Sequence, residues 1–213
     1  MANTSWQYPH SEILVFVKAP VPGQVKTRLA VDIGNEMAAA VSETMMYQIL
    51  GMLQASSIAP VTLYVAGDAS HPAIETAGAS VQKIQPQIEG DLGARMAQAM
   101  TTTLASRKKA ILIGTDCPIM QIDYLQQALN AESDVVLGPA EDGGYVLIGM
   151  SVDTPSIFTG IDWGTDNVLQ QTRNKIDQEK LTVTELDRLW DVDYFTDLQR
   201  WLPGVTSKTV FTD

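Results

Sequence analysis

Three cationic side chains are concentrated in one short loop of an otherwise acidic chain. Lys18, Lys26 and Arg28 are the only lysines or arginines before residue 83, and the formal net charge of the chain is -11. Arginine can bind phosphate oxygens through two parallel hydrogen bonds, whereas lysine acts as a mobile point charge. The spacing therefore predicts an anion-binding loop. The alternative is a solvated loop whose cations pair with nearby carboxylates.

Small and rigid residues shape the same loop, VFVKAPVPGQVKTRLA at 15–30. Gly23 lets the backbone approach a ligand closely, while Pro20 and Pro22 stiffen its path. The pair Lys26 and Thr27 lacks the G-x-x-x-x-G-K spacing of a Walker loop, and the G-x-G-x-x-G dinucleotide pattern is absent as well. The loop thus differs from both of these phosphate-binding motifs.

A single aspartate, Asp116, follows the apolar run at 110–115 in the segment GTDCP. Mg²⁺ is commonly held by one or two carboxylates together with phosphate oxygens and water, which makes Asp116 a candidate metal ligand. A turn or helix-capping aspartate is the alternative. The adjacent Cys117 is the only cysteine and has no histidine in a partner position, so we interpret it as a packed thiol.

Two further acidic segments lie later in the chain. In GPAEDGGY, residues 138–145, Asp142 precedes two glycines that leave backbone open to a sugar or base, although a simple turn explains the pattern equally well. In DVDYFTDL, Asp191 and Asp193 resemble the start of a phosphatase motif. Phe195 stands where that motif has Thr or Val, so the phosphatase hypothesis is weak.

These candidate residues need a framework of alternating strands and helices. Near-continuous apolar runs predict strands covered on both faces, at 12–17, 61–66, 110–115, 134–139 and 145–150. Helical periodicity predicts helices at 35–53, 92–103, 122–129 and 167–178. The alternation favours a three-layer α/β/α sandwich with a mostly parallel sheet, which binds ligands beyond the carboxyl ends of its strands. The turn-rich stretch 150–166 would be a lid or an acceptor-side loop.

The composition narrows the classes of partner. At 213 residues with 45% hydrophobic residues, we expect one domain over 1–213. The charge of -11 argues against nucleic acid and against anionic membrane surfaces. Neither a membrane span nor a signal peptide is indicated, so a cytoplasmic location is expected. Edge strands and exposed helices would support a homodimer.

Five segments, taken in order, resemble a known family. FVKAPVPGQVKTRLA, GDLGARM, GTDCP, GPAEDGGYVLIG and DVDYFTDL, spread over about residues 12 to 200, are similar to bacterial GT-A-fold, nucleotide-diphospho-sugar-transferase-like proteins. That family is related to the 2-phospholactate guanylyltransferases and is often described as radical-SAM/selenodomain-associated transferases. The resemblance implies a nucleotide-binding sheet of the GT-A type whose strand-end aspartate holds Mg²⁺ or Mn²⁺.

The resemblance also implies roles for particular residues. Asp116 would bind the metal together with Asp191 or Asp193. Arg95 would face the nucleotide or acceptor, or would pair with a carboxylate on its own helix. The residues implied at the nucleotide and its phosphates are Lys18, Pro20, Gly23, Lys26, Thr27, Arg28, Asp91 and Arg95, and those on the sugar or acceptor side are Asp142, Gly143, Gly144 and Tyr145.

Two departures from related enzymes bear on the reaction. Many GT-A glycosyltransferases carry a D-x-D pair where this chain has Thr115-Asp116-Cys117-Pro118, and sugar nucleotidyltransferases usually have a more glycine-rich opening loop. The leading hypothesis is a metal-dependent transferase that moves a nucleotidyl group from a nucleoside triphosphate to a small phosphorylated or hydroxylated acceptor. Lys26, Arg28 and the metal on Asp116 would offset charge on the phosphoryl oxygens. The alternatives are glycosyl transfer from a nucleotide sugar and a non-catalytic nucleotide-binding partner.

Overall fold

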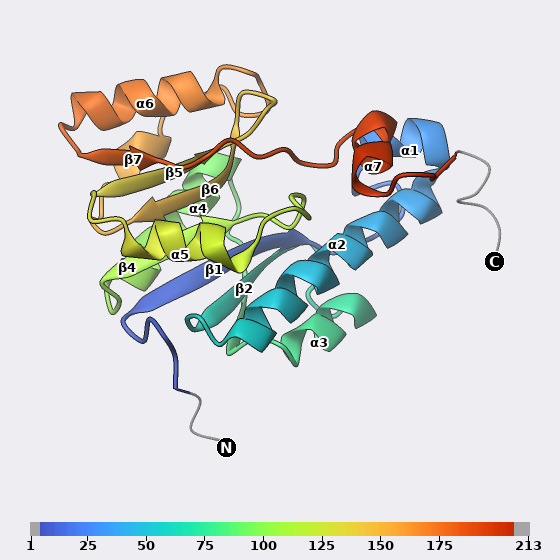
Figure 1. The fold of residues 1–213 in the computed structure, drawn as a ribbon, viewed down its shortest axis with the longest axis horizontal. Helices are drawn as coiled ribbons and strands as arrows, with labels where there is room; N and C mark the ends of the chain where they lie inside the picture. Colours follow the sequence, from blue (N-terminus) through green and yellow to red (C-terminus); the bar gives the residue numbers. More distant parts are fainter. Residues whose placement is uncertain (1–4, 207–213) are drawn as a thin grey trace.

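One mixed sheet forms the centre of the molecule in the computed structural model, which describes residues 5–206 (Figure 1). Its strand order is β3-β2-β1-β4-β6-β5-β7. The strands are β1 (Ser11–Lys18), β2 (Val61–Ala66), β3 (Lys83–Pro86), β4 (Lys109–Ile113), β5 (Val135–Pro139), β6 (Tyr145–Met150) and β7 (Val183–Glu185). All five predicted strands are confirmed, and the sheet is mostly parallel as expected.

Strand β6 is the exception to the parallel arrangement. It pairs antiparallel with β4 on one side and with β5 on the other. Only residues 140–144 connect β5 to β6, and a parallel connection needs a crossover of a dozen or more residues. The sequence predicted a mostly parallel sheet without giving the direction of this strand, and the short connection makes it antiparallel.

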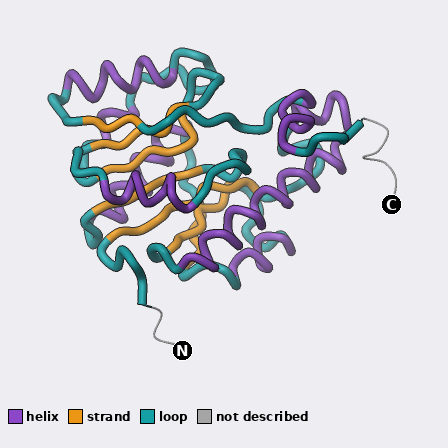
Figure 2. The backbone as a smooth tube through the Cα atoms, viewed as in Figure 1, coloured by secondary structure: helices purple, strands orange, loops and turns teal. Residues whose placement is uncertain are grey.

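Helices cover both faces of the sheet, which confirms the three-layer architecture (Figure 2). They are α1 (Thr27–Ile33), α2 (Asn35–Ser56), α3 (Pro72–Gly78), α4 (Leu92–Leu104), α5 (Ile122–Asn130), α6 (Val168–Gln178) and α7 (Phe195–Trp201), with a short 3-10 helix η1 (Pro155–Phe158). Ile13, Val15 and Val17 of β1 pack toward α2, α3 and α5. Leu14, from the same strand, packs on the opposite side with residues of α4 and α6. This alternation along β1 places an apolar core on each side of the sheet.

A third apolar cluster lies beyond the sheet, at the right-hand side of Figure 1. Leu29 and Ile33 of α1 meet Met45 of α2 and Leu198 of α7 there, around the buried Val192. The late segment that carries Val192 therefore returns to the loop that follows β1. Asp191 and Asp193 reach the same end of the sheet as Lys26 by this route.

The stretch 150–166 is anchored by its own apolar residues. Ile157 and Phe158 of η1 are buried in the core between α4 and α6. The expectation of a turn-rich segment is confirmed for its flanks, while its middle forms a helical turn that packs on the core. This packing positions Trp163, which follows η1, beside α4.

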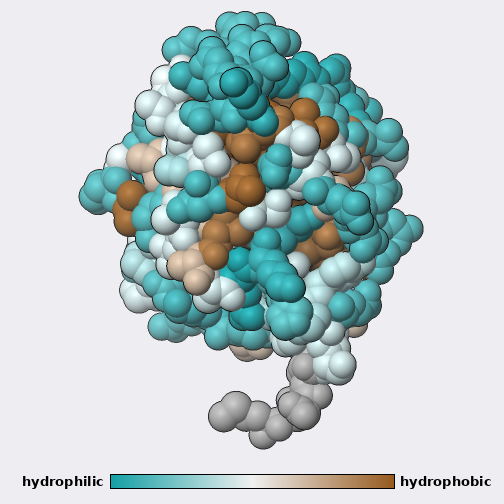
Figure 3. Space-filling view, turned by 90° about the vertical axis from the view of Figure 1, so that its left-hand side faces the viewer, coloured by the Kyte–Doolittle hydropathy of each residue, from teal (hydrophilic) through white to brown (hydrophobic). Residues whose placement is uncertain are grey.

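The end of the molecule that lies away from the apolar cluster of α1, α2 and α7 has a mostly hydrophilic surface. Figure 3, which views the left-hand side of Figure 1, shows a largely hydrophilic face with apolar residues gathered in a band through its middle.

Among the described residues, no helix combines the length and apolar character needed to cross a membrane.

Candidate functional site

Two adjoining cavities open at the carboxyl ends of the central strands, where parallel sheets bind ligands. We call them the cationic cavity and the acidic cavity. Their volumes are about 380 Å³ and 360 Å³, respectively. Both are lined by Phe16, Leu92, Gly114 and Asp116, so the two cavities meet at the end of β4.

Charge separates the two cavities. The cationic cavity is lined by Lys18, Lys26, Arg28 and Arg95, together with Thr27, Gln87, Asp116 and Asp193 among others. The acidic cavity is lined by Asp116, Asp142 and Asp191, with apolar and aromatic walls that include Tyr145 and Trp163. In the part of the chain that the structure describes, no lysine or arginine lines the acidic cavity.

Lys26 lies between two aspartates and is nearly inaccessible. Its Nζ donates to Asp116 Oδ2 and to Asp193 Oδ1, each at 2.9 Å, and its side chain is 4% exposed. Burial lowers the pKa of Lys26, but the two carboxylates raise it more, and the net pKa lies above its ordinary value. Lys26 also has a φ of 46°, a conformation that costs a non-glycine residue energy. The predicted phosphate-binding ammonium is thus bound to two carboxylates of the protein.

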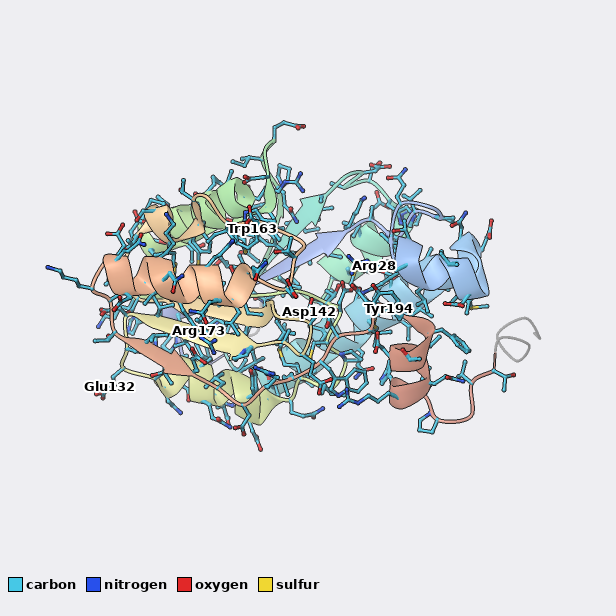
Figure 4. All side chains as sticks on the ribbon, turned by 90° about the horizontal axis from the view of Figure 1, so that it is seen from above. Arg28, Glu132, Asp142, Trp163, Arg173 and Tyr194 are labelled. Carbon is cyan, nitrogen blue, oxygen red and sulfur yellow. The ribbon has the colours of Figure 1, made fainter. Side chains whose placement is uncertain are left out.

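Three other cations remain accessible in the cationic cavity. Arg28 donates from Nη1 to Asp193 Oδ2 at 3.0 Å, and its guanidinium lies 5.6 Å from the centre of the Tyr194 ring. Lys18 donates to the backbone oxygen of Gln24 at 2.8 Å. Arg95 donates from Nε to the backbone oxygen of Gly90 at 2.9 Å. Figure 4 shows Arg28 and Tyr194 on the same side of the site as α7.

Some residues predicted at the nucleotide have structural roles instead of lining a cavity. Asp91 is the N-cap of α4, where its Oδ1 accepts from the amide of Ala94 at 2.8 Å. Pro20 is buried, and Gly23 turns the loop with a φ of 79°. None of these three lines either cavity, whereas Thr27 does line the cationic one.

Asp116 links the end of β4 to the late segment. The amide of Val192 donates to its backbone oxygen at 2.9 Å. Its side chain is 48% exposed, and Oδ2 is the oxygen that binds Lys26. The adjacent Cys117 is buried, and burial raises the pKa of its thiol to about 12. A thiol with that pKa stays protonated at neutral pH, as expected of a packed cysteine.

Asp191 is a half-buried carboxylate in acidic surroundings. Burial, Asp142 and Asp193 raise its pKa to about 6, although Lys26 acts in the opposite direction. Asp193 differs because its two oxygens are occupied by Lys26 and Arg28. A divalent cation would find hard oxygen ligands in Asp116 and Asp191, which line the same cavity. The ligand chemistry of these two carboxylates suits Mg²⁺ or Mn²⁺, and Asp193 is positioned by its ion pairs. Among the described residues, no three His, Cys, Asp or Glu side chains are grouped closely enough to hold a metal on their own, so phosphate oxygens and water would supply the other ligands.

Removing the charge of Asp191 is expected to stabilise the protein above neutral pH. An aspartate whose folded pKa is raised stabilises the fold most at low pH and loses that contribution as pH rises through about 6. Asp191→Asn should therefore raise the melting temperature at pH 8 by about 2–5 °C, with a smaller difference at pH 5. Thermal unfolding at both values checks this. Asp177→Asn, an exposed position on α6, is the control.

The turn between β5 and β6 depends on a glycine with no room for a side chain. Asp142 Oδ1 accepts from the amide of Gly144 at 2.8 Å, and the oxygen of Gly143 accepts from the amide of Leu169 at 2.9 Å. Gly143 has a φ of 89°, and a Cβ there would lie 2.2 Å from the backbone oxygen of Asp166. This close approach joins the β5–β6 turn to the segment before α6.

Gly143→Ala is expected to destabilise the fold by about 3 kcal/mol, because the left-handed backbone and the contact with Asp166 both oppose a side chain. Gly164→Ala is a matched control, since Gly164 has a φ of 83° but open space around its Cβ position. The control should cost only about 1 kcal/mol. Denaturant unfolding measures both values, and equal losses would show that the Asp166 contact is unimportant.

Several residues that line the cavities were not predicted from the sequence. Phe16 is part of an apolar strand, where its side chain was indistinguishable from core residues. Leu92 begins α4 and is exposed, and Trp163 follows η1. A tryptophan in a turn-rich stretch beside a predicted acceptor loop was the one signal that pointed toward a ligand.

Comparisons with known proteins agree with this architecture. A family described as "Uncharacterized protein conserved in bacteria (DUF2064)" matches residues 49–165. A search of curated proteins found no match. A candidate nucleotide-diphospho-sugar transferase from Desulfovibrio desulfuricans is 34% identical, with 95% of this chain and 94% of that chain covered and a TM-score of 0.82.

More distant structures share the fold. The inositol-1-phosphate CTP transferase of T. maritima is 14% identical, with 97% of this chain and 95% of that chain covered and a TM-score of 0.59. Rv0371c of Mycobacterium tuberculosis, in complex with manganese, is 16% identical, with 92% and 98% covered and a TM-score of 0.56. At these identities the likeness concerns the backbone arrangement, which confirms the predicted fold class.

Proposed function

This chain belongs to the bacterial DUF2064 family, and from that premise we propose that it is a metal-dependent transferase that uses a nucleotide donor. Nucleotidyl transfer from a nucleoside triphosphate to a small acceptor is the favoured reaction. The observation that carries the proposal is the junction of a cationic and an acidic cavity at Asp116. A donor with several phosphates suits the first cavity, and an acceptor in the second would reach the donor at that junction.

The accessible cations would hold the donor phosphates. Arg28, Lys18 and Arg95 line the cationic cavity, and Arg28 presents a planar guanidinium that suits phosphate oxygens. Fixed positive charge beside the reacting phosphoryl group stabilises the charge that develops during transfer. Lys26 acts differently in this proposal, as a positioning residue that orients Asp116 and Asp193.

The metal would be Mg²⁺ or Mn²⁺, held by Asp116 and Asp191. Bound there, it would offset negative charge on the donor phosphates, as divalent ions do in phosphoryl transfer. The half-buried, like-charged surroundings of Asp191 favour a nearby cation. The chain's own part is to orient Asp116 through Lys26 and to tie it to the late segment through the amide of Val192.

Glycosyl transfer from a nucleotide sugar is the second candidate. It is favoured by the aromatic wall of the acidic cavity, where Tyr145 and Trp163 meet edge to face with ring centres 6.4 Å apart. Aromatic rings together with carboxylates such as Asp142 provide the apolar contact and hydrogen-bond acceptors that a sugar needs. The same donor phosphates would occupy the cationic cavity in both reactions.

Product analysis distinguishes the candidates. The protein is incubated with each nucleoside triphosphate or nucleotide sugar, a mixture of small acceptors, and Mg²⁺ or Mn²⁺. Pyrophosphate released from a triphosphate supports nucleotidyl transfer, and nucleoside diphosphate released from a nucleotide sugar supports glycosyl transfer. Nucleotide-dependent thermal stabilisation without either product would identify a non-catalytic binding protein. If the protein shows no thermal stabilisation by any nucleotide and forms no product, the proposal is rejected.

Removing the accessible cations is expected to weaken nucleotide binding. Arg28→Ala and Lys18→Ala should each raise the dissociation constant by about tenfold, because each removes a charge-assisted hydrogen bond to phosphate. Isothermal titration calorimetry with the nucleotide that stabilises the protein most provides the measurement. Arg173→Ala is a matched control, since Arg173 pairs with Glu185 and lines neither cavity. Unchanged affinity in both test variants would exclude these side chains from the phosphate site.

A further inference from the structure

Among the residues that the structure describes, the acidic cavity lacks the cationic side chains with which proteins usually bind phosphate. All four lysines and arginines of the site line the cationic cavity. The acidic cavity has Asp116, Asp142 and Asp191, and no described lysine or arginine among its lining residues. Phosphate and carboxylate ligands are commonly held by arginine and lysine side chains. A metal ion held by Asp116 and Asp191 would offset their charge, so Asp142 is the carboxylate that an anionic acceptor would meet in this cavity.

Asp142 differs from its neighbours because no cation compensates it. The adjacent Glu141 accepts from both terminal nitrogens of Arg200, at 2.7 and 3.1 Å. Asp116 is paired with Lys26. Asp142 is exposed, and its one hydrogen bond among the described contacts is Oδ1 with the amide of Gly144. This bond holds the carboxylate at the mouth of the acidic cavity while leaving Oδ2 free to accept from a ligand.

The remaining walls suit a small molecule with an uncharged body. Phe16, Met96, Tyr145 and Trp163 line the cavity, and the volume of about 360 Å³ is at the small end of the range for ligand pockets. Trp163 is held in place by close contact with α4, since a Cβ added to Gly93 would lie 2.7 Å from Trp163 Nε1. Figure 4 shows Trp163 and Asp142 in neighbouring parts of the site.

We propose that the acceptor is an uncharged or cationic small molecule that bears hydroxyl or amino groups, and that Asp142 determines this selectivity by accepting a hydrogen bond and repelling phosphate. The inference rests on the proposed function for the role of the cavity. It narrows the acceptor class, because it retains hydroxylated acceptors and excludes phosphorylated ones. In this arrangement Asp142 touches the acceptor, while the cations of the other cavity bind the donor.

Matched probes test the acceptor class by binding, so the test does not depend on turnover. The pairs are glucosamine with glucosamine 6-phosphate, ethanolamine with phosphoethanolamine, and glycerol with glycerol 3-phosphate. Dissociation constants are measured by saturation-transfer NMR titrations with pyrophosphate present, which is expected to occupy the cationic cavity and keep the esters out of it. We expect the wild type to bind at least one unphosphorylated probe, and to prefer it over its phosphate ester by about tenfold.

Asp142→Asn then tests the negative charge of Asp142 separately from the hydrogen bond that its side chain makes. Asparagine retains the oxygen that accepts from the Gly144 amide, so the turn is preserved while the negative charge is removed. The preference for the unphosphorylated probe should fall by about fivefold. Asp177→Asn on α6 makes the same change of charge away from both cavities and should leave the preference unchanged.

The outcomes separate this inference from the proposed function. A phosphate ester that binds the wild type as well as its unphosphorylated partner overturns the inference. The inference is also overturned if the wild type binds none of the unphosphorylated probes. It is overturned as well if Asp142→Asn keeps the wild-type preference for unphosphorylated over phosphorylated probes. A separate titration with pyrophosphate alone reports on the donor site. Failure of that titration counts against the proposed function and leaves the comparison of acceptor probes valid, since the esters then have no competing site.

Discussion

Asp116→Asn is expected to lower the turnover number of the transferase by about 100-fold to 1000-fold while leaving the fold intact. Asp116 lies where the two cavities meet, so under the proposed function it is the carboxylate best placed to act on both donor and acceptor. Losing one charged group that stabilises a transition state commonly costs a factor of this size. The fold should persist because Lys26 keeps its contact with Asp193. Steady-state kinetics with the donor found by product analysis, together with thermal unfolding, provide the measurement.

Asp193→Asn is the matched control for this prediction. Asp193 binds the same lysine but does not line the acidic cavity. Its replacement should reduce turnover less than Asp116→Asn does, because it disturbs positioning without removing a group at the junction. If the two variants lose turnover equally, Asp116 acts only through Lys26. If Asp116→Asn keeps wild-type turnover, the junction is not the reaction centre.

Lys26→Met is expected to reduce the free energy of unfolding by about 3 kcal/mol at pH 7. The substitution keeps the length and apolar stem of a side chain that is 4% exposed, but leaves Asp116 and Asp193 without their shared cation. Asp116 is left unpaired but is 48% exposed, and Asp193 keeps Arg28, so the loss lies at the lower end of the roughly 3–5 kcal/mol typical of a broken buried ion pair. Denaturant unfolding of wild type and variant at pH 7 provides the measurement.

Lys18→Met is the control within the same loop, since Lys18 is exposed and binds only a backbone oxygen. It should change stability by less than about 0.5 kcal/mol. The double variant with Asp193→Asn should recover part of the loss, as expected for directly coupled residues. A double variant that recovers none of the loss would assign it to packing.

The sequence predicted the central strands and long helices because their patterns are strong. Near-continuous apolar runs such as that of β1 indicate strands buried on both faces, and α2 carries a regular apolar stripe. The edge strands β3 and β7 escaped prediction because they are short and mostly exposed, with sequences KIQP and VTE. The reversed direction of β6 follows from the length of the preceding turn, which alternation does not reveal.

The sequence predicted individual residues of the candidate site, but not which of them form ion pairs with one another. Asp116 and the loop cations stood out because they follow apolar strands. The contacts of Lys26 with Asp116 and Asp193 depend on how the late segment folds back over the sheet, which local pattern does not encode. Asp91 could have been assigned from the sequence, because an aspartate directly before a helical run is a common N-cap.

The contact between Lys26 and Asp193 also determines when the site can assemble during synthesis. The two residues are 167 positions apart, so at about 5–20 residues per second Asp193 is made roughly 8–33 s after Lys26. A growing chain that has reached α5 would already contain Lys26 and Asp116 but would lack Asp193, Val192 and α7. Emerging chains would therefore carry the cationic cavity without Asp193, and that cavity would be complete only once the late segment had docked.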